Sequence, residues 1–272
     1  MIRGGTRVGI RDTTGASRSS AIDKTPQQLW FPLREERDDA LRLFVFPYAG
    51  GSAAAFRAWP QRLPANVELL AVQPPGREQR LRETPLRRIP EVVEALLGVT
   101  APLLDRPFAF FGHSLGALVA YELARTLRER GGPQPVHLFA SGARAPHMPL
   151  PEDPAHVLRG DAFLDRLRRL GGTPPEVLAH RELVELFTPM LLADFEMSET
   201  YGTEAPDPLD VPLTALGGTE DAEVSLARLE PWREQTTAAY DLRLYPGGHF
   251  FIHTEQADVL DAVGEALAPH LA

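Results

Sequence analysis

The chain has 272 residues, of which 43% are hydrophobic and 24% are charged, and its formal net charge is −9. This length suits an α/β domain with a substantial core, and the negative charge argues against a general nucleic-acid binder, which needs a basic face to replace phosphate counterions. There is no cysteine, which excludes disulfides, a cysteine nucleophile and thiolate metal sites.

Residues 1–28 carry arginine, glycine, serine and threonine but no apolar central stretch, so they are not a secretory signal. We expect a flexible N-terminal tail here and a single folded domain over residues 29–272. No segment reaches 18 consecutive apolar residues, which predicts no transmembrane helix and no association with a membrane. These features favour a cytoplasmic protein.

From residue 41 onward, short apolar runs alternate with helical patterns. Strands are expected at 41–46, 67–72, 108–111, 136–140, 211–216 and 241–245, and helices at 52–62, 89–104, 115–130 and 255–271. Strands joined through helices indicate parallel pairing with right-handed crossovers. Because the strands are almost continuously apolar, we expect a mostly parallel sheet with helices on both faces.

The strand rhythm stops at about residues 145–210, where only helical patterns and proline-rich joints occur. Helices are expected at 161–170, 174–180 and 182–200, and Pro189 is expected to bend or split the last of them. We interpret this insertion as a helical lid, because binding sites in open α/β sheets lie at the carboxyl edge of the strands. A plain structural insertion is the alternative.

Residues 112–116 have the sequence Gly-His-Ser-Leu-Gly, between an apolar strand and a helical pattern. Strand, sharp turn and helix are the context in which Gly-x-Ser-x-Gly forms a nucleophile elbow. Glycines two residues to either side let the neighbouring backbone pass where a Cβ would clash. Ser114 is therefore the candidate nucleophile.

A serine hydroxyl needs an adjacent base, and the base follows the acid in the chain order of this fold type. His249 stands in Pro-Gly-Gly-His-Phe-Phe (246–251), directly after an expected strand, in a loop that can present the imidazole to the elbow. His253 lies four residues on, a spacing found in helical metal sites, but no third ligand is apparent and we expect no metal.

The acid should leave a strand end between the serine and the histidine. Asp221 meets this condition at the end of Gly-Thr-Glu-Asp (218–221), and it could accept the Nδ1–H of His249 and stabilise the imidazolium. Glu220 is the nearest rival. Three other aspartates precede the strand or lie in the expected lid: Asp194, Asp207 and Asp210.

An oxyanion hole needs two N–H donors. One should be the backbone N–H of Leu115, just after the nucleophile. The second should come from the loop at 46–52, Phe-Pro-Tyr-Ala-Gly-Gly-Ser, where Ala49 is our choice; Ser52 is also placed to cap the helix that follows. This loop matches neither the dinucleotide nor the P-loop pattern, so no cofactor is expected.

Taken together, the motifs at 46–52, 112–117, 218–221 and 246–251, with Gln-Pro-Pro-Gly-Arg-Glu at 73–78, resemble those of type II thioesterases. These are the free-standing editing enzymes of polyketide and nonribosomal peptide assembly lines. The lid segments at 170–175 and 193–196 are similar too, so the resemblance covers about residues 40–270. Tyr48 departs from it, since the family usually has histidine there.

The resemblance implies an α/β-hydrolase fold with a helical lid and hydrolysis of acyl groups from the phosphopantetheine thioester of an acyl or peptidyl carrier protein. Ser114 would take the acyl group, and water activated by His249 would release it as a free acid. We expect a monomer that edits or unloads an assembly line. A small-molecule esterase or lipase, an acyltransferase and a binding protein without turnover remain alternatives.

Carrier proteins of this type are usually acidic, so docking to a chain of charge −9 requires a local basic patch. Two arginine clusters are candidates, and simple solvated arginines are the other interpretation. The clusters are Arg77, Arg80, Arg82, Arg87 and Arg88, and Arg166, Arg168 and Arg169.

Overall fold

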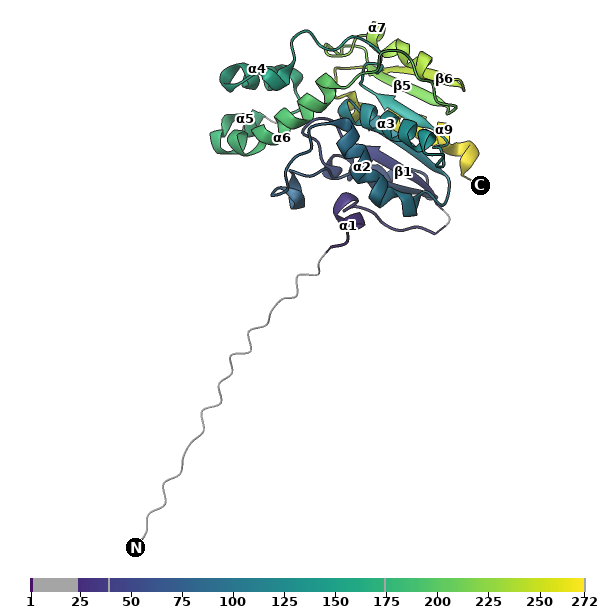
Figure 1. Ribbon diagram of the computed structural model, residues 1–272, viewed down its shortest axis with the longest axis horizontal. Coiled ribbons are helices and arrows are strands. Elements are labelled where there is room, and N and C mark those ends of the chain that lie inside the picture. The colour runs from purple at the N-terminus through teal and green to yellow at the C-terminus, as the bar shows by residue number, and fades with distance from the viewer. Residues whose placement is uncertain (2–23, 39, 174, 272) are drawn as a thin grey trace.

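The computed structural model describes residues 1, 24–38, 40–173 and 175–271 (Figure 1). Within them lies a six-stranded sheet in the order β2-β1-β3-β4-β5-β6, with every neighbouring pair parallel. This confirms the predicted α/β fold with a parallel sheet. The strands are β1 (Leu41–Phe46), β2 (Val67–Ala71), β3 (Phe108–His113), β4 (Leu138–Ser141), β5 (Leu213–Gly218) and β6 (Tyr240–Tyr245).

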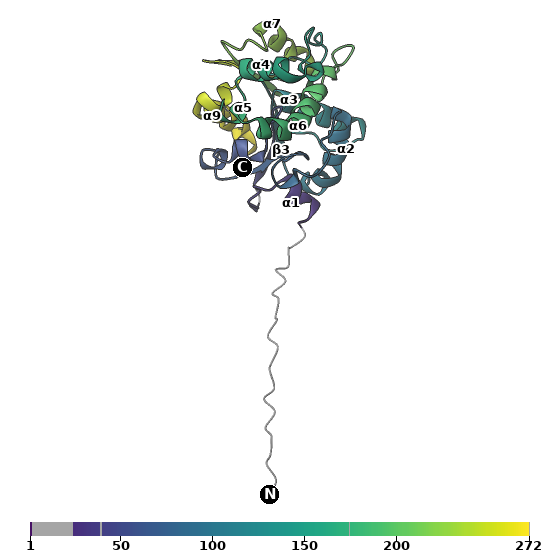
Figure 2. The same cartoon turned by 90° about the vertical axis from the view of Figure 1, so that its left-hand side faces the viewer.

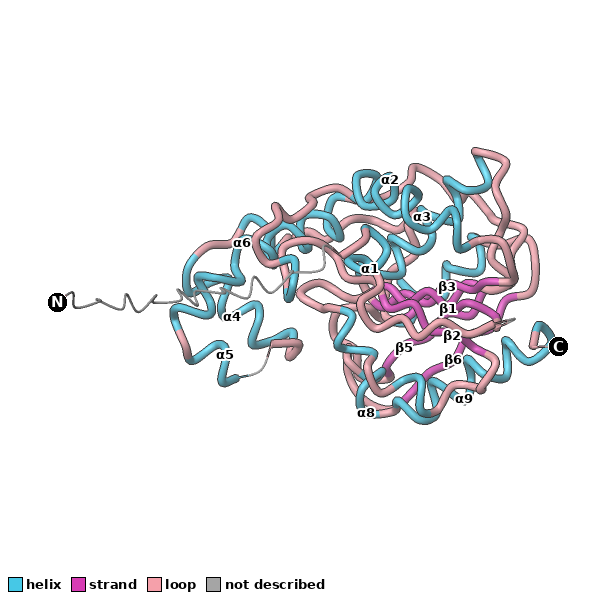
Figure 3. The backbone as a smooth tube through the Cα atoms, turned by 90° about the horizontal axis from the view of Figure 1, so that it is seen from below, coloured by secondary structure: helices cyan, strands magenta, loops and turns pink. Residues whose placement is uncertain are grey.

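Helices cover both faces of the sheet. In Figure 3, α2 (Ile89–Thr100) and α3 (Leu115–Glu129) lie on one side of the strands, while α8 (Phe251–Thr254) and α9 (Gln256–Leu267) lie on the other. Outside the insertion at about residues 145–210, the described residues also form the short helices α1 (Pro26–Trp30) and α7 (Leu226–Leu229).

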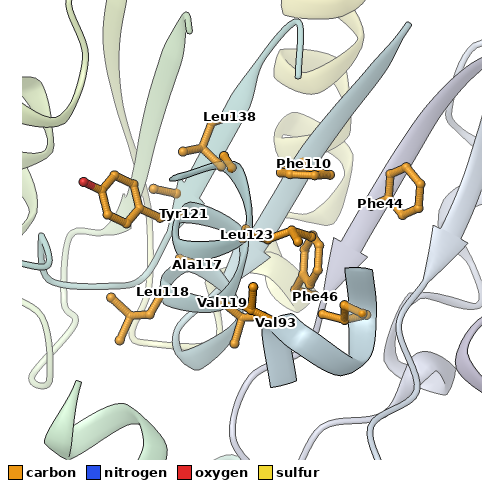
Figure 4. Close-up of a cluster of buried hydrophobic side chains, with 14 of the residues drawn as sticks. Phe44, Phe46, Val93, Phe110, Ala117, Leu118, Val119, Tyr121, Leu123 and Leu138 are labelled. Atoms are coloured by element: carbon orange, nitrogen blue, oxygen red, sulfur yellow. The ribbon is translucent and has the colours of Figure 1, made fainter. Parts of the chain in front are cut away.

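The alternating side chains of β1 explain why the sequence is apolar without interruption there. Phe44 and Phe46 point to the α2–α3 face, where Phe46 meets Phe110 edge to face at a centroid distance of 5.4 Å (Figure 4). Leu43 and Val45 belong to the opposite core, which α9 covers. A central strand buried on both faces needs apolar residues at every position.

Three expected helices differ from the structure, and proline accompanies each difference. The helix expected at 89–104 ends at Thr100, and a 3₁₀ turn with Pro102 follows at Ala101–Leu103. Residues 52–62 form two 3₁₀ turns, Ala53–Phe56 and Trp59–Gln61, where an α-helix was predicted. Pro60 has no N–H to donate to the carbonyl of residue 56, so the α-helical ladder cannot run through it. In the same way, Pro269 follows the end of α9, and the last turn, Ala268–His270, is 3₁₀.

The lid consists of α4 (Gly160–Leu170), α5 (Pro175–Ala179) and α6 (Arg181–Thr200). Figures 1 and 3 show α4 and α5 beyond one end of the sheet, and Figure 2 looks onto the lid. A small core of its own holds the lid together, with Phe163 and Leu167 of α4 packed with Met190 and Leu191 of α6. Pro189 does not split α6, which runs as one helix to Thr200.

The first helix begins at a lower residue number than the predicted start of the domain. Residues 2–23 of the predicted tail lie outside the described residues, but α1 begins at Pro26. Thr25 caps this helix through a capping box with Gln28, and Trp30 is buried at its end. Helix α1 therefore begins three residues before the predicted boundary at residue 29.

Among the described residues, no helix is both long enough and apolar enough to cross a membrane. The expected localisation and the expected monomeric state stay predictions.

A buried histidine beside β4 predicts how stability depends on pH. His137 stacks on Phe139 at 4.3 Å between ring centroids, its Nε2 lies 2.9 Å from Thr214 Oγ1, and burial lowers the pKa of His137 to about 4. Its neutral form is therefore preferred in the folded state, while the unfolded chain takes up the proton near pH 6.5. Its contribution, about 3 kcal/mol, is fully present above pH 6.5 and is lost as the pH falls towards 4.

Denaturant unfolding between pH 7 and pH 4.5 measures this dependence. We expect the loss of stability on acidification to be smaller in His137→Phe, which keeps the aromatic stack and has no proton to gain. An equal loss in both proteins would contradict the assignment to His137.

Candidate active site

Ser114 occupies the sharp turn between β3 and α3. Its backbone has φ 54° and ψ −119°, a conformation that non-glycine residues rarely adopt. The Ser114 N–H donates to the Ser141 carbonyl at 2.7 Å, which continues the pairing of β3 with β4 up to the turn. Such a strained serine between a strand and a helix has the geometry expected of a nucleophile elbow.

The flanking glycines permit a very close approach of three backbone segments. A Cβ on Gly112 would lie 2.2 Å from the Gly116 carbonyl oxygen, and one on Gly116 would lie 2.1 Å from the carbonyl oxygen of Phe46. Both distances are far below any real Cβ contact, so a side chain at either position would push α3 away from the sheet. This is the clash that the sequence pattern predicted.

His249 and Asp221 lie together, although they are 28 residues apart in the chain. His249 Nδ1 is 2.8 Å from Asp221 Oδ2, and the Asp221 side chain is fully buried. Its other oxygen, Oδ1, accepts the backbone N–H groups of Glu223 and Val224 at 2.8 and 3.0 Å. Because the carboxylate accepts, a neutral His249 carries its proton on Nδ1 and has Nε2 free as a base. Glu220, the rival acid, is exposed.

The loops that carry the acid and the histidine touch each other. A Cβ on Gly218 would lie 2.4 Å from the Gly248 carbonyl oxygen, and the Glu220 N–H donates to the Gly247 carbonyl at 2.8 Å. The parallel pairing of β5 with β6 brings the two strand ends side by side. The geometry of the sheet thus places an acid and a histidine at its carboxyl edge.

Ser114 and His249 line one cavity of about 1110 Å³ between the sheet and the lid. The lid contributes both apolar and charged groups to its wall, among them Leu167, Arg169, Leu191, Phe195 and Glu199. Residues of α4 and α6 therefore line the same cavity as the elbow, at the carboxyl edge of the sheet.

The N–H groups of Leu115 and Ala49, the two expected oxyanion donors, differ from neighbouring N–H groups in their hydrogen bonding. Leu115 is the first residue of α3, where a helix leaves its N–H groups without partners inside the helix. In the loop after β1, the Gly51 N–H donates to the Tyr48 carbonyl at 2.8 Å and the Gly50 N–H to the Asp194 carboxylate. Within the described part of the chain, no acceptor takes the Ala49 N–H, and Ala49 lines the cavity.

Two rings pack against His249, a contact that the sequence did not predict. The ring centroid of buried His113 lies 5.2 Å from that of His249, and Phe250 meets His249 edge to face at 5.2 Å. Burial holds the pKa of His113 well below its ordinary value, so His113 stays neutral and adds no positive charge beside His249. In the sequence, the only sign of this role for His113 is its position between the glycine and the serine of the Gly-x-Ser-x-Gly pattern.

Tyr48 and His253 contact each other at the rim of the site. The Tyr48 hydroxyl lies 3.1 Å from His253 Nε2, and the Tyr48 ring packs edge to face on Phe250. Among the described residues, no cluster of three or more histidines, aspartates or glutamates could hold a metal ion. Both His249 and His253 pack against Phe250, and His253 also packs against Tyr48.

Most arginines of the two clusters make hydrogen bonds or ion pairs within the protein, and burial removes two of them from the surface. Arg77 and Arg80 are buried, and Arg80 donates to Glu83 and lies over the Trp30 ring. Arg82 and Arg169 are exposed. The other four form ion pairs, namely Arg87 and Arg88 with Glu196, Arg166 with Glu223, and Arg168 with Asp165.

Comparisons with known proteins agree on one family. The profile described as "Thioesterase domain" matches residues 41–267. The gramicidin S biosynthesis protein GrsT of Aneurinibacillus migulanus is 42% identical over 221 residues, 81% of this chain and 86% of that protein. The structure of RedJ, a thioesterase from the prodiginine pathway of Streptomyces coelicolor, is 37% identical with a TM-score of 0.79 and covers 89% of this chain and 99% of that one. YbtT, a type II thioesterase from the yersiniabactin NRPS/PKS pathway, is 33% identical with a TM-score of 0.78, covering 88% and 97%.

Proposed function

Because this chain belongs to the thioesterase domain family, we propose that it hydrolyses acyl thioesters on the phosphopantetheine arm of acyl or peptidyl carrier proteins. The observation that carries the proposal is the shared cavity of Ser114 and His249, with Asp221 bonded to the far side of the imidazole. Its volume, about 1110 Å³, exceeds that of most small-molecule sites, which leaves room for an acyl group and the end of the arm.

In the first half-reaction, Ser114 Oγ attacks the thioester carbonyl while His249 Nε2 takes the hydroxyl proton. Asp221 stabilises the imidazolium that forms, through the bond at Nδ1. The carbonyl oxygen, now negative, accepts the N–H groups of Ala49 and Leu115. The C–S bond then breaks, the imidazolium protonates the departing phosphopantetheine thiolate, and the acyl group remains on Ser114 as an ester.

In the second half-reaction, water replaces the thiol. His249 removes a proton from the water as it attacks the acyl-enzyme, the same two N–H groups hold the oxyanion, and Ser114 leaves with the proton returned by the imidazolium. The products are a free acid and the unchanged enzyme. No cofactor or metal takes part in either step.

The names of the relatives support a role on a natural-product assembly line. YbtT is described as a type II thioesterase of an NRPS/PKS pathway and GrsT as a gramicidin S biosynthesis protein. By analogy, we propose that this chain removes stalled or incorrect acyl units or unloads a product. Docking of an acidic carrier would use exposed basic groups; of the two arginine clusters, Arg82 and Arg169 are the candidates left by the ion pairs, and Arg169 also lines the cavity.

Hydrolysis of acyl-carrier substrates tests the function directly. We expect the purified protein to remove acyl groups from a phosphopantetheinylated carrier, read as loss of the acyl mass from the carrier, and to release the free acid. The acyl groups on the carrier should form a series of increasing chain length, and a p-nitrophenyl ester should be assayed in parallel.

The same experiment separates the alternatives. Turnover of the p-nitrophenyl ester without any loss from the carrier would contradict the proposal and indicate a small-molecule esterase. Acyl transfer to an added alcohol in place of water would indicate an acyltransferase. If a fluorophosphonate does not label Ser114 and the protein turns over neither substrate, the chain would be a binding protein.

A further inference from the structure

A carboxylate of the lid reaches the loop that carries Ala49. Asp194 belongs to α6, is 1% exposed, and accepts the Gly50 N–H at Oδ2 over 2.8 Å. The sequence analysis placed Asp194 in the lid and gave it no role. Its hydrogen bond lies on the residue next to the proposed oxyanion donor, so the lid helix contacts the catalytic machinery through a charged, buried group.

Arg77 completes the connection from a different part of the fold. Its Nη1 and Nη2 donate to the two oxygens of Asp194 at 2.7 and 2.8 Å, and the guanidinium is almost fully buried. The same Nη1 also donates to the Gly51 carbonyl at 2.9 Å, and Nε donates to the Pro75 carbonyl at 3.3 Å. One ion pair thus holds the N–H of Gly50 and the C=O of Gly51, while leaving the Ala49 N–H free.

Packing against α6 also restricts the backbone of this loop. Gly50 has φ +77°, and a Cβ there would lie 2.7 Å from Leu191 Cδ2, so α6 lies directly against the loop backbone. The peptide between Tyr48 and Ala49, which carries the Ala49 N–H, is held by the bond from the Gly51 N–H to the Tyr48 carbonyl at 2.8 Å, and the ion pair and the lid helix hold the Gly50 and Gly51 backbone on which that bond depends. An oxyanion donor contributes to catalysis only while it is held in position before the reaction.

We propose that Arg77 and Asp194 are positioning residues that fix the Ala49 N–H in the oxyanion hole, so that helix α6 of the lid is part of the catalytic scaffold. The proposal rests on the proposed function of Ala49 as a donor. A buried ion pair adds little net stability compared with an apolar pair, so its main effect here is on geometry. Arg77 also neutralises the Asp194 carboxylate, which would otherwise oppose the negative charge that develops on the substrate oxygen.

Asp194→Asn is the informative variant, and the chain offers a matched control. The amide keeps the size of the side chain but presents an N–H to a donor where the carboxylate accepted three bonds. Glu68→Gln makes the same change in a second buried carboxylate, which pairs with Arg34 and Arg42. Glu68 is the second residue of β2, at the end of the sheet opposite the elbow.

With a p-nitrophenyl ester as substrate, we expect Asp194→Asn to lower kcat by about 10²-fold, the scale of a lost oxyanion donor, with little change in KM. Arg77→Lys keeps the charge but not the paired donors, and it should lie between Asp194→Asn and the wild type. Glu68→Gln should keep the wild-type kcat even if its melting temperature falls. A trifluoromethyl ketone, which forms an oxyanion on Ser114, should bind Asp194→Asn more weakly in proportion to the loss of kcat/KM.

An unchanged kcat in folded Asp194→Asn would overturn the proposal, and so would an equal loss in Glu68→Gln. So would a fall in kcat with unchanged affinity for the ketone, because a misplaced donor must affect both. The ester needs no carrier, so failure of the protein to act on carrier-bound acyl groups would overturn the proposed function and leave this comparison of variants intact.

Discussion

Replacing Ser114 by alanine is expected to lower kcat for acyl-carrier hydrolysis by about 10⁶-fold, the loss seen when the nucleophile of a serine hydrolase is removed. The hydroxyl is the only atom that can take the acyl group at the strained turn after β3. The backbone donors and the cavity remain in the variant, so residual binding of the substrate should persist. Loss of the acyl mass from the carrier, followed over time, measures the change.

The control for this prediction is the thermal stability of the variant. Ala at position 114 adds no atom near Gly112 or Gly116, so the melting temperature of the variant should stay close to that of the wild type. Labelling by a fluorophosphonate should disappear in Ser114→Ala. Turnover by the variant above a few per cent of the wild-type rate would show that another group attacks the thioester.

Asp221→Asn should cost about 10⁴-fold in kcat, because the amide favours the wrong histidine tautomer. In the wild type, the carboxylate accepts from His249 Nδ1, and Nε2 is free to act as base. An asparagine that keeps its bonds to the N–H groups of Glu223 and Val224 must offer its NH₂ to Nδ1. The proton then moves to Nε2, where it blocks the removal of the serine proton.

Glu220→Gln is the matched control, since it neutralises the adjacent, exposed carboxylate. We expect it to retain the wild-type kcat and pH profile. If Glu220→Gln lost activity and Asp221→Asn kept it, the acid would have to be assigned to Glu220, which the geometry places away from the imidazole.

The elements that the sequence predicted well are those whose cause is local. Phe44 and Leu43 point to opposite cores, and a strand buried on both faces leaves an apolar run that is readable in the sequence. The elbow was predictable because Gly-x-Ser-x-Gly stands between a strand and a helix within one short segment, and the close contact of Gly116 with the Phe46 carbonyl shows why a glycine is needed there. Asp221 and His249 follow from their glycine-rich turns at strand ends.

The features that the sequence did not predict depend on contacts across the fold. Arg77 and Asp194 are 117 residues apart, and nothing near either residue indicates that they form a buried pair. Arg80 was placed on the surface because arginine usually lies there, but tertiary packing buries it over Trp30. Only the three-dimensional structure shows which arginines remain exposed.

A covalent acyl group on Ser114 is the central claim, and rapid quenching tests it. The protein is mixed with an acyl-loaded carrier, quenched with acid during turnover and digested, and the peptide that contains Ser114 is analysed by mass spectrometry. We predict that this peptide gains the mass of the acyl group minus one hydrogen, and that Ser114→Ala gains none. Steady hydrolysis of the carrier with no acylated peptide at any time, or with the acyl group on another residue, would contradict the account.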